Sequence, residues 1–186
     1  MSEYNKRGVV LDHNFPVMPI ILMAGAILLR LFGHVRGIDT LIFHACAVLM
    51  IMGMILHRLN LQLLTGIGTL GFAVYNLCMI FRSAYFISGY GFDGGNFFNI
   101  IISLLAFAAY VVSGLHYVIR RPKPGKPAKL ILMIPLVCLL MIMGVVMFFH
   151  VLSYASAAVA LSALLKYCAE ILMAFALMVY TPFREA

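Results

Sequence analysis

The chain has 186 residues, of which 65% are hydrophobic and only 10% charged, and this composition excludes a soluble globular domain, whose surface needs far more polar residues. The formal net charge of +7 does not indicate a nucleic-acid-binding protein, because no soluble domain displays the basic residues. We expect these residues to orient the chain and to attract anionic headgroups. The expected partner is the lipid bilayer, and a nucleic-acid partner is not expected.

Six apolar segments follow one another along the chain. Each has about 18 residues or more, enough at about 1.5 Å per residue to cross a hydrocarbon core of ~30 Å. Short connections force consecutive helices to pack antiparallel. The sequence therefore predicts an all-α polytopic membrane protein, a single six-transmembrane-helix bundle that occupies residues 1–186. The expected spans are residues 16–33, 39–57, 62–87, 96–119, 130–153 and 156–181.

The basic stretch RRPKPGKPAK, residues 120–129, separates the fourth span from the fifth, and its prolines favour an extended spacer. Lys and Arg gather in cytoplasmic loops, so this loop is predicted to face the cytoplasm. Six crossings then place the N- and C-termini on the same side, in the cell membrane. The basic residues of the loop are Arg120, Arg121, Lys123, Lys126 and Lys129.

A 3+3 inverted repeat is a further expectation. The second and fifth spans share the sequence LMIMG, from Leu49 and from Leu140, and this offset is close to half the chain. A match this short arises by chance among so many Leu, Met and Ile residues, so it gives the repeat only weak support.

Polar residues at the span boundaries are expected to serve helix structure. Asp39 and Asp93 precede or begin the second and fourth spans, where a side-chain oxygen can cap free backbone N–H groups. Ser113 and Gly114 are expected to let neighbouring backbones approach closely. No metal site is indicated, because the cysteines form no CxxC pair and have no neighbouring His at ligand spacing.

The sixth span carries two charged residues close to the membrane midplane. Lys166 and Glu170 are four residues apart and therefore on one face of the helix. One interpretation is a self-neutralising pair that helps the helix to recognise its neighbours. The other is a protonatable carboxylate in a conduction path, because a charge at this depth is costly and is a functional hypothesis by default.

Three further polar residues could accompany Glu170 in a ligand or ion pathway. Arg82 and Asn76 lie on nearby faces of the third span, where together they could ligate an anionic group. His44 lies at a similar depth in the second span. Arg30, near the end of the first span, is expected instead to snorkel to the headgroups.

Four histidines form two pairs matched by depth, His44 with His150 and His57 with His116. The levels are separated by about 20 Å along a helix, as two b-type haems would require, and a neutral imidazole is a suitable axial ligand. This spacing resembles that of membrane dihaem cytochromes b along one helix only. The thirteen steps from His44 to His57 turn the second residue about 220° from the first, which favours ordinary packing or boundary histidines.

No catalytic motif occurs: the chain has no HExxH, no serine elbow and no Gly-rich phosphate loop. The expected function is a small membrane carrier or the membrane-embedded subunit of a transport system. The alternatives are a transmembrane electron carrier with haem b, and a structural or assembly subunit of a larger membrane complex. The short chain also favours a homo-oligomer or association with other membrane subunits.

The predicted topology can be tested with reporter insertions. A fluorescent protein inserted within residues 120–129 should fold and emit, because that loop is expected in the cytoplasm. Alkaline phosphatase inserted at the same place should be inactive, and the two reporters should give the reverse result within residues 153–156. Phosphatase activity at residues 120–129 would contradict the orientation.

Overall fold

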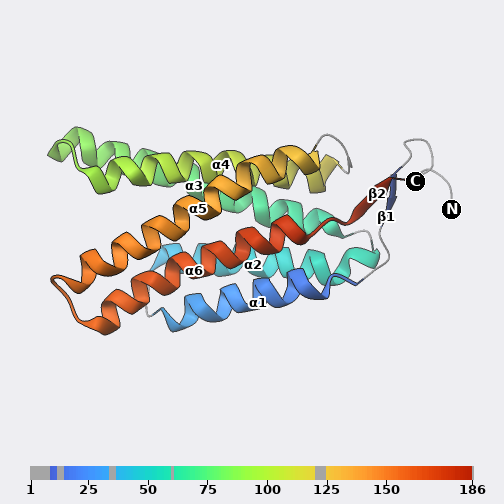
Figure 1. Cartoon of the computed structure of the whole chain (residues 1–186). Helices are drawn as coiled ribbons and strands as arrows, with labels where there is room; N and C mark the ends of the chain where they lie inside the picture. Colours follow the sequence, from blue (N-terminus) through green and yellow to red (C-terminus); the bar gives the residue numbers. More distant parts are fainter. Residues whose placement is uncertain (1–8, 12–14, 34–36, 60, 120–124, 186) are drawn as a thin grey trace.

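The structure is a computed structural model that describes residues 9–11, 15–33, 37–59, 61–119 and 125–185. Six α-helices account for most of the chain, which confirms the predicted six-helix bundle (Figure 1). The predicted bounds agree with the observed ones to within a few residues, except at the start of the fifth helix. The helices are α1 Val17–Phe32, α2 Ile38–Ile55, α3 Gln62–Tyr90, α4 Gly94–Ile119, α5 Gly125–Leu152 and α6 Ala157–Val179, and a short 3-10 helix, η2 Leu56–Leu59, follows α2.

The helices are arranged as a closed ring. Each packs against its neighbours in the chain, and α6 returns to pack against α1. The order of helices around the ring is thus the order in the sequence. Helices on opposite sides, such as α2 and α5, are separated by two others whichever way the ring is followed.

The fifth helix begins earlier than predicted. Residues 120–124 lie outside the described residues, but α5 starts at Gly125, so the expectation of an extended spacer up to residue 129 is wrong. The physical reason is the position of Pro127, which falls in the first turn of the helix. A proline there loses no hydrogen bond, because the first backbone N–H groups of a helix have no intrahelical acceptor.

Two short strands that the sequence pattern did not predict join the two ends of the chain. β1 Val9–Leu11 pairs antiparallel with β2 Phe183–Glu185. The two strands lie at one end of the bundle (Figure 1), as an even number of crossings requires. We call this the proximal end and the opposite one, with the α3–α4 and α5–α6 connections, the distal end. The cytoplasmic location of the proximal end and the inverted repeat stay predictions.

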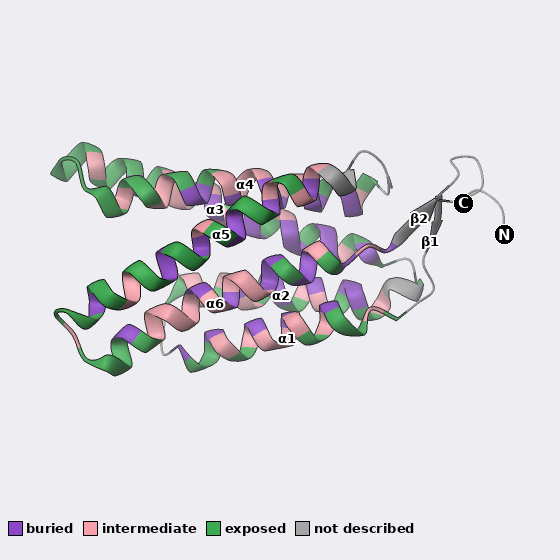
Figure 2. Ribbon diagram, viewed as in Figure 1, coloured by how far each residue is buried: buried purple, intermediate pink, exposed green. Residues whose placement is uncertain are grey.

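The outer surface of the bundle is apolar. Every helix exposes large hydrophobic residues, and Figure 2 shows exposed positions along all six helices. Among these residues are Ile21, Leu41, Val74, Leu104, Ile142 and Leu161. Five of the helices are long and apolar enough to cross a membrane. A surface this apolar is stable in lipid rather than in water. The chain is therefore a multi-pass membrane protein.

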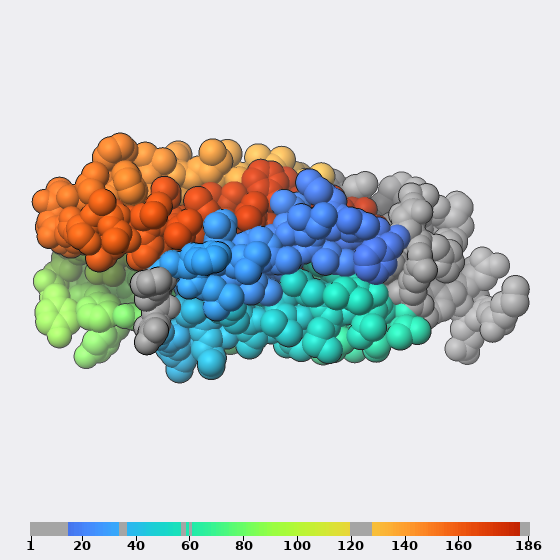
Figure 3. Space-filling model, turned by 90° about the horizontal axis from the view of Figure 1, so that it is seen from below, coloured from blue at the N-terminus to red at the C-terminus, as the bar shows by residue number. Residues whose placement is uncertain are grey.

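The first helix is shorter than the other five and ends below the distal surface. It has 16 residues, which corresponds to about 24 Å. A Cβ atom placed on Gly33, directly after α1, would lie 3.4 Å from the backbone oxygen of Ser162, which is already one turn inside α6. The α5–α6 and α3–α4 ends extend beyond α1 (Figures 1 and 3). The described part of α1 therefore ends short of the two distal connections.

Glycines let three helices approach closely. A Cβ on Gly68 in α3 would lie 2.6 Å from the Cys46 backbone oxygen in α2, and one on Gly53 would collide with Thr65. Between α3 and α4, a Cβ on either Gly66 or Gly114 would lie 3.2 Å from the backbone oxygen of the other. The predicted packing role of Gly114 is confirmed.

Replacing these glycines tests how much the bundle depends on close contact. Gly68→Ala should lower the free energy of unfolding by about 1–3 kcal/mol, because the added methyl group meets backbone that cannot move aside. The measurement is thermal unfolding in detergent, followed by the loss of the helical circular dichroism signal. Gly89→Ala, on the same helix with nothing within 4 Å of the added carbon, is the control and should not lower stability. Equal behaviour of the two variants would contradict the proposed packing.

Candidate functional site

A buried ion pair joins α1 to α6 in the interior of the ring. Arg30 Nη1 lies 3.6 Å from Glu170 Oε1, and the two side chains are 2% and 17% exposed. Charge-assisted hydrogen bonds are usually about 2.7–2.9 Å long, so this contact is an ion pair without a hydrogen bond. Nε and Nη1 of Arg30 are buried without a hydrogen-bond acceptor among the described residues. The guanidinium is held by charge and packing alone.

The expectation that Arg30 snorkels to the headgroups is wrong. A snorkelling side chain keeps its charged head in water, but the side chain of Arg30 is buried and its guanidinium lies against Glu170. Arg30 therefore lies at the level of the middle of α6 and points into the bundle.

The partner of Glu170 also differs from the one that its own helix offers. Among the described residues, the ion pair of Glu170 is with Arg30 and not with Lys166. Lys166 is partly exposed, and its ammonium lies 5.8 Å from the centre of the Tyr167 ring, close enough for a cation–π contact. A self-neutralising pair within α6 is therefore not what the structure contains.

Aromatic side chains surround the ion pair, and with it they form what we call the central cluster. The guanidinium of Arg30 lies 5.3 Å from the centre of the Phe43 ring. The charges of Arg30 and Glu170 both act on the hydroxyl groups of Tyr75 and Tyr167. The charge of Glu170 also acts on the hydroxyl group of Tyr110. The cluster consists of Arg30, Phe43, Tyr75, Tyr110, Tyr167 and Glu170, supplied by every helix except α5.

A second, more exposed ion pair lies between the central cluster and the distal surface. Arg82 Nη1 is 3.9 Å from Asp39 Oδ2, with the side chains 59% and 27% exposed. The charges of this pair, like those of the buried pair, act on the hydroxyl group of Tyr75. The predicted capping by Asp39 is wrong, since the N-cap of α2 is Gly37 and Asp39 stands in the first turn facing Arg82. Capping of α4 by Asp93 is confirmed: its Oδ2 accepts the backbone N–H of Asn96 at 2.9 Å.

The other predicted pathway residues are only partly brought together. Asn76 is buried and donates from Nδ2 to the Phe72 carbonyl at 2.8 Å, whereas Arg82 is exposed, so the two do not form one anion site. His44 donates from Nδ1 to the Thr40 carbonyl at 2.6 Å. Its Nε2 is buried without a hydrogen-bond partner among the described residues.

The histidine pairs proposed as haem ligands do not gain support. His44 is on α2 and His150 on α5, which lie on opposite sides of the ring, and the side chain of His150 is exposed. His116 is buried in α4 against the ring of Tyr117. The side chain of His57 lies outside the described residues, so the inner pair stays untested.

Sequence reasoning missed a buried lysine at the proximal end. Lys129 is 0% exposed, and its ammonium donates to the carbonyls of Leu177 and Tyr180 at 2.7 and 3.0 Å. These carbonyls end α6, where the helix dipole favours a cation. Assigning Lys129 to a cytoplasmic loop was wrong because α5 has already begun. Pro127, suited to a first helical turn, was the signal that could have revealed it.

The described residues contain no group of three or more His, Cys, Asp or Glu side chains that could hold a metal ion. Comparisons with protein-family models, with curated proteins and with solved structures find no match to this chain.

Breaking the buried ion pair should destabilise the bundle more than removing both of its members. Arg30→Met alone should lower the free energy of unfolding by about 3 kcal/mol, because Glu170 is left buried and unpaired. Adding Glu170→Leu should recover most of that loss. Lys166→Met is the control and should change stability by less than about 1 kcal/mol. Thermal unfolding in detergent provides the measurement, and a double variant no more stable than Arg30→Met would contradict the pairing.

Proposed function

We propose that the protein is a small membrane carrier, or the membrane-embedded subunit of a transport system. In this proposal, the carboxylate of Glu170 exchanges its ion pair with Arg30 for a proton. The observation that carries this proposal is the loose ion pair between Arg30 and Glu170 in the middle of the bundle. Ionisable residues at membrane depth typically mark the path of an ion or a proton.

The geometry of the pair favours exchange over a fixed structural role. Removing both groups from water is costly, and the attraction offsets that cost only when the contact is close and hydrogen-bonded. At 3.6 Å, with unused donors on Arg30, the pair lacks those bonds. A proton that reaches Glu170 therefore competes with a weakly held partner, and the guanidinium released is then able to bind an anionic group.

The Asp39–Arg82 pair supports an entry route from the distal side. The pair is partly exposed in the distal parts of α2 and α3, and the charges of both ion pairs act on the hydroxyl group of Tyr75. A charged solute or proton thus meets an exposed pair first and the buried pair second. Each ion pair contains one positive and one negative side chain, which lowers the free-energy cost of moving a cation or an anion into the bundle.

Proton flux into proteoliposomes tests the proposal. Purified protein is reconstituted with the pH-sensitive dye pyranine inside, and a potassium diffusion potential drives proton entry. Glu170→Gln should reduce the initial rate by about tenfold or more, because a carboxamide cannot take up a proton at the buried position. Asp93→Asn, which makes the same chemical change at the distal end outside the central cluster, should retain the rate of the unmodified protein.

Two outcomes would overturn this function. One is a rate for the unmodified protein no higher than that of empty liposomes, and the other is an undiminished rate for Glu170→Gln. If stability falls in Glu170→Gln while flux does not, the pair serves only to hold α1 against α6, as expected for an assembly subunit. That subunit should then co-purify with partner membrane proteins.

A further inference from the structure

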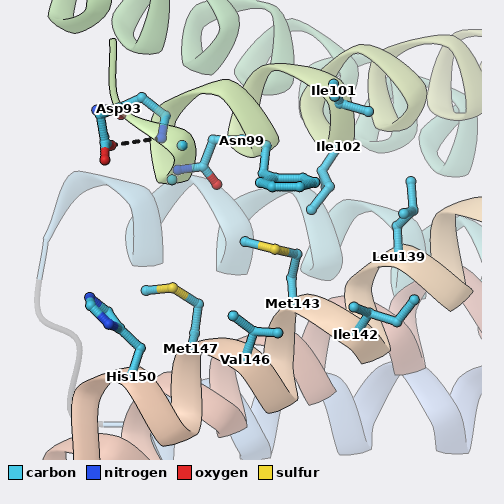
Figure 4. Close-up of a pocket in the computed structure, with 14 residues that line it drawn as sticks. Asp93, Asn99, Ile101, Ile102, Leu139, Ile142, Met143, Val146, Met147 and His150 are labelled. Carbon is cyan, nitrogen blue, oxygen red and sulfur yellow. Dashed lines mark hydrogen bonds between the residues drawn. The ribbon is translucent and has the colours of Figure 1, made fainter. Parts of the chain in front are cut away.

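A groove opens between α4 and α5 at the distal end, away from the central cluster. Its volume is about 810 Å³. Figure 4 shows side chains from both helices turned toward the space between them. Lining residues such as Phe98, Ile101, Ile142 and Val146 are themselves exposed, so the groove opens on the outside of the bundle, where lipid lies.

Polar and apolar groups are separated along the groove. Asp93, Asn99 and His150 lie at one end, near the distal surface, and Ile101, Ile102, Leu139 and Ile142 lie deeper (Figure 4). The lining residues extend from His150 back to Leu139 on α5, about 16 Å at 1.5 Å per residue. This is close to the depth of one leaflet, half of a ~30 Å hydrocarbon core. The groove therefore has the length and polarity of a single lipid.

The charge at the mouth of the groove determines which headgroup fits. Asp93 uses Oδ2 to accept the backbone and side-chain N–H groups of Asn96, at 2.9 and 3.0 Å. Its Oδ1 accepts no hydrogen bond from the described residues, and none of the described Lys and Arg residues lines the groove. Within the described part of the chain, the mouth thus presents a carboxylate without a cationic partner, beside the imidazole of His150 and the amide of Asn99. A headgroup that brings a cation with N–H donors complements this mouth.

We propose that this groove binds a phospholipid with a primary amine headgroup, of the phosphatidylethanolamine class. The ammonium pairs with Asp93, the phosphate lies toward Asn99 and His150, and one acyl chain follows the apolar wall past Ile102 and Met143. The site does not depend on Glu170 or on the transport function proposed above. In this proposal, a lipid of one leaflet binds the protein specifically, in addition to the lipids that surround it as solvent.

Tryptophan fluorescence tests the proposal, because the chain contains no Trp. A single Trp is introduced by Ile142→Trp inside the groove or, as the control, by Leu104→Trp on the lipid-facing side of α4. The two sites match: Leu104 follows Gly94 by ten residues and Ile142 precedes Leu152 by ten, and they are 58% and 59% exposed. Each variant is reconstituted in vesicles that contain phosphatidylethanolamine, phosphatidylcholine or phosphatidylglycerol brominated on the acyl chain.

At Ile142→Trp, brominated phosphatidylethanolamine should bind about threefold better than brominated phosphatidylcholine, the preference expected from one exposed ion pair. At Leu104→Trp the three lipids should quench equally. Adding Asp93→Asn to Ile142→Trp should remove the preference while retaining the helix cap, because Asn also caps. Phe98→Trp, at another lining residue of the groove, replaces Ile142→Trp if that variant does not fold.

Three results would overturn the site. Equal quenching by all three lipids at Ile142→Trp would make the groove ordinary lipid-facing surface. Stronger quenching by phosphatidylglycerol would exclude the amine headgroup. A preference that survives Asp93→Asn would show that the carboxylate does not recognise the lipid. None of these results bears on the proton flux through Glu170, so the two proposals fail independently.

Discussion

The two opposite charges of Arg30 and Glu170, enclosed in an apolar bundle, are the constraint that the interior of the ring has to satisfy. A lone guanidinium or carboxylate inside an apolar bundle is prohibitively unstable, so each member requires the other. Their helices are the first and the last of the ring, and the pair lies across the contact where α6 meets α1. The two charges therefore neutralise each other at the contact between α1 and α6, which is also the contact that closes the ring.

The surroundings of the pair explain how so small a bundle encloses two charges. Glycines at the α2–α3 and α3–α4 contacts bring backbones close together. Large aromatic rings, Phe43, Phe72 and Tyr110, then fill the space inside with edge-to-face contacts at 5.7 and 5.1 Å between ring centres. Close backbones on one side and large rings on the other leave little room for water around the charges.

The helices were predictable because their signal is local. An apolar run long enough to cross lipid is recognisable from its own residues, and the cap formed by Asp93 lies within one turn of its helix. The candidate site was harder to predict from the sequence than the helices. Glu170 has a local neighbour, Lys166, but its partner Arg30 is 140 positions away in the sequence. Nothing in the pattern indicates that α6 returns to α1, that the first helix ends below the surface, or that α4 and α5 leave a groove between them.

The short first helix also has a consequence for the membrane itself. With 16 residues it spans about 24 Å, less than the ~30 Å of a typical hydrocarbon core. Such hydrophobic mismatch is relieved when the surrounding bilayer thins on one side of the protein. Lipids beside α1 must therefore tilt or compress, while those beside the longer α3 and α4 do not. The protein is thus expected to deform its host membrane asymmetrically, which gives it a preferred rotational orientation toward thin or curved patches and toward neighbouring proteins that impose the same distortion.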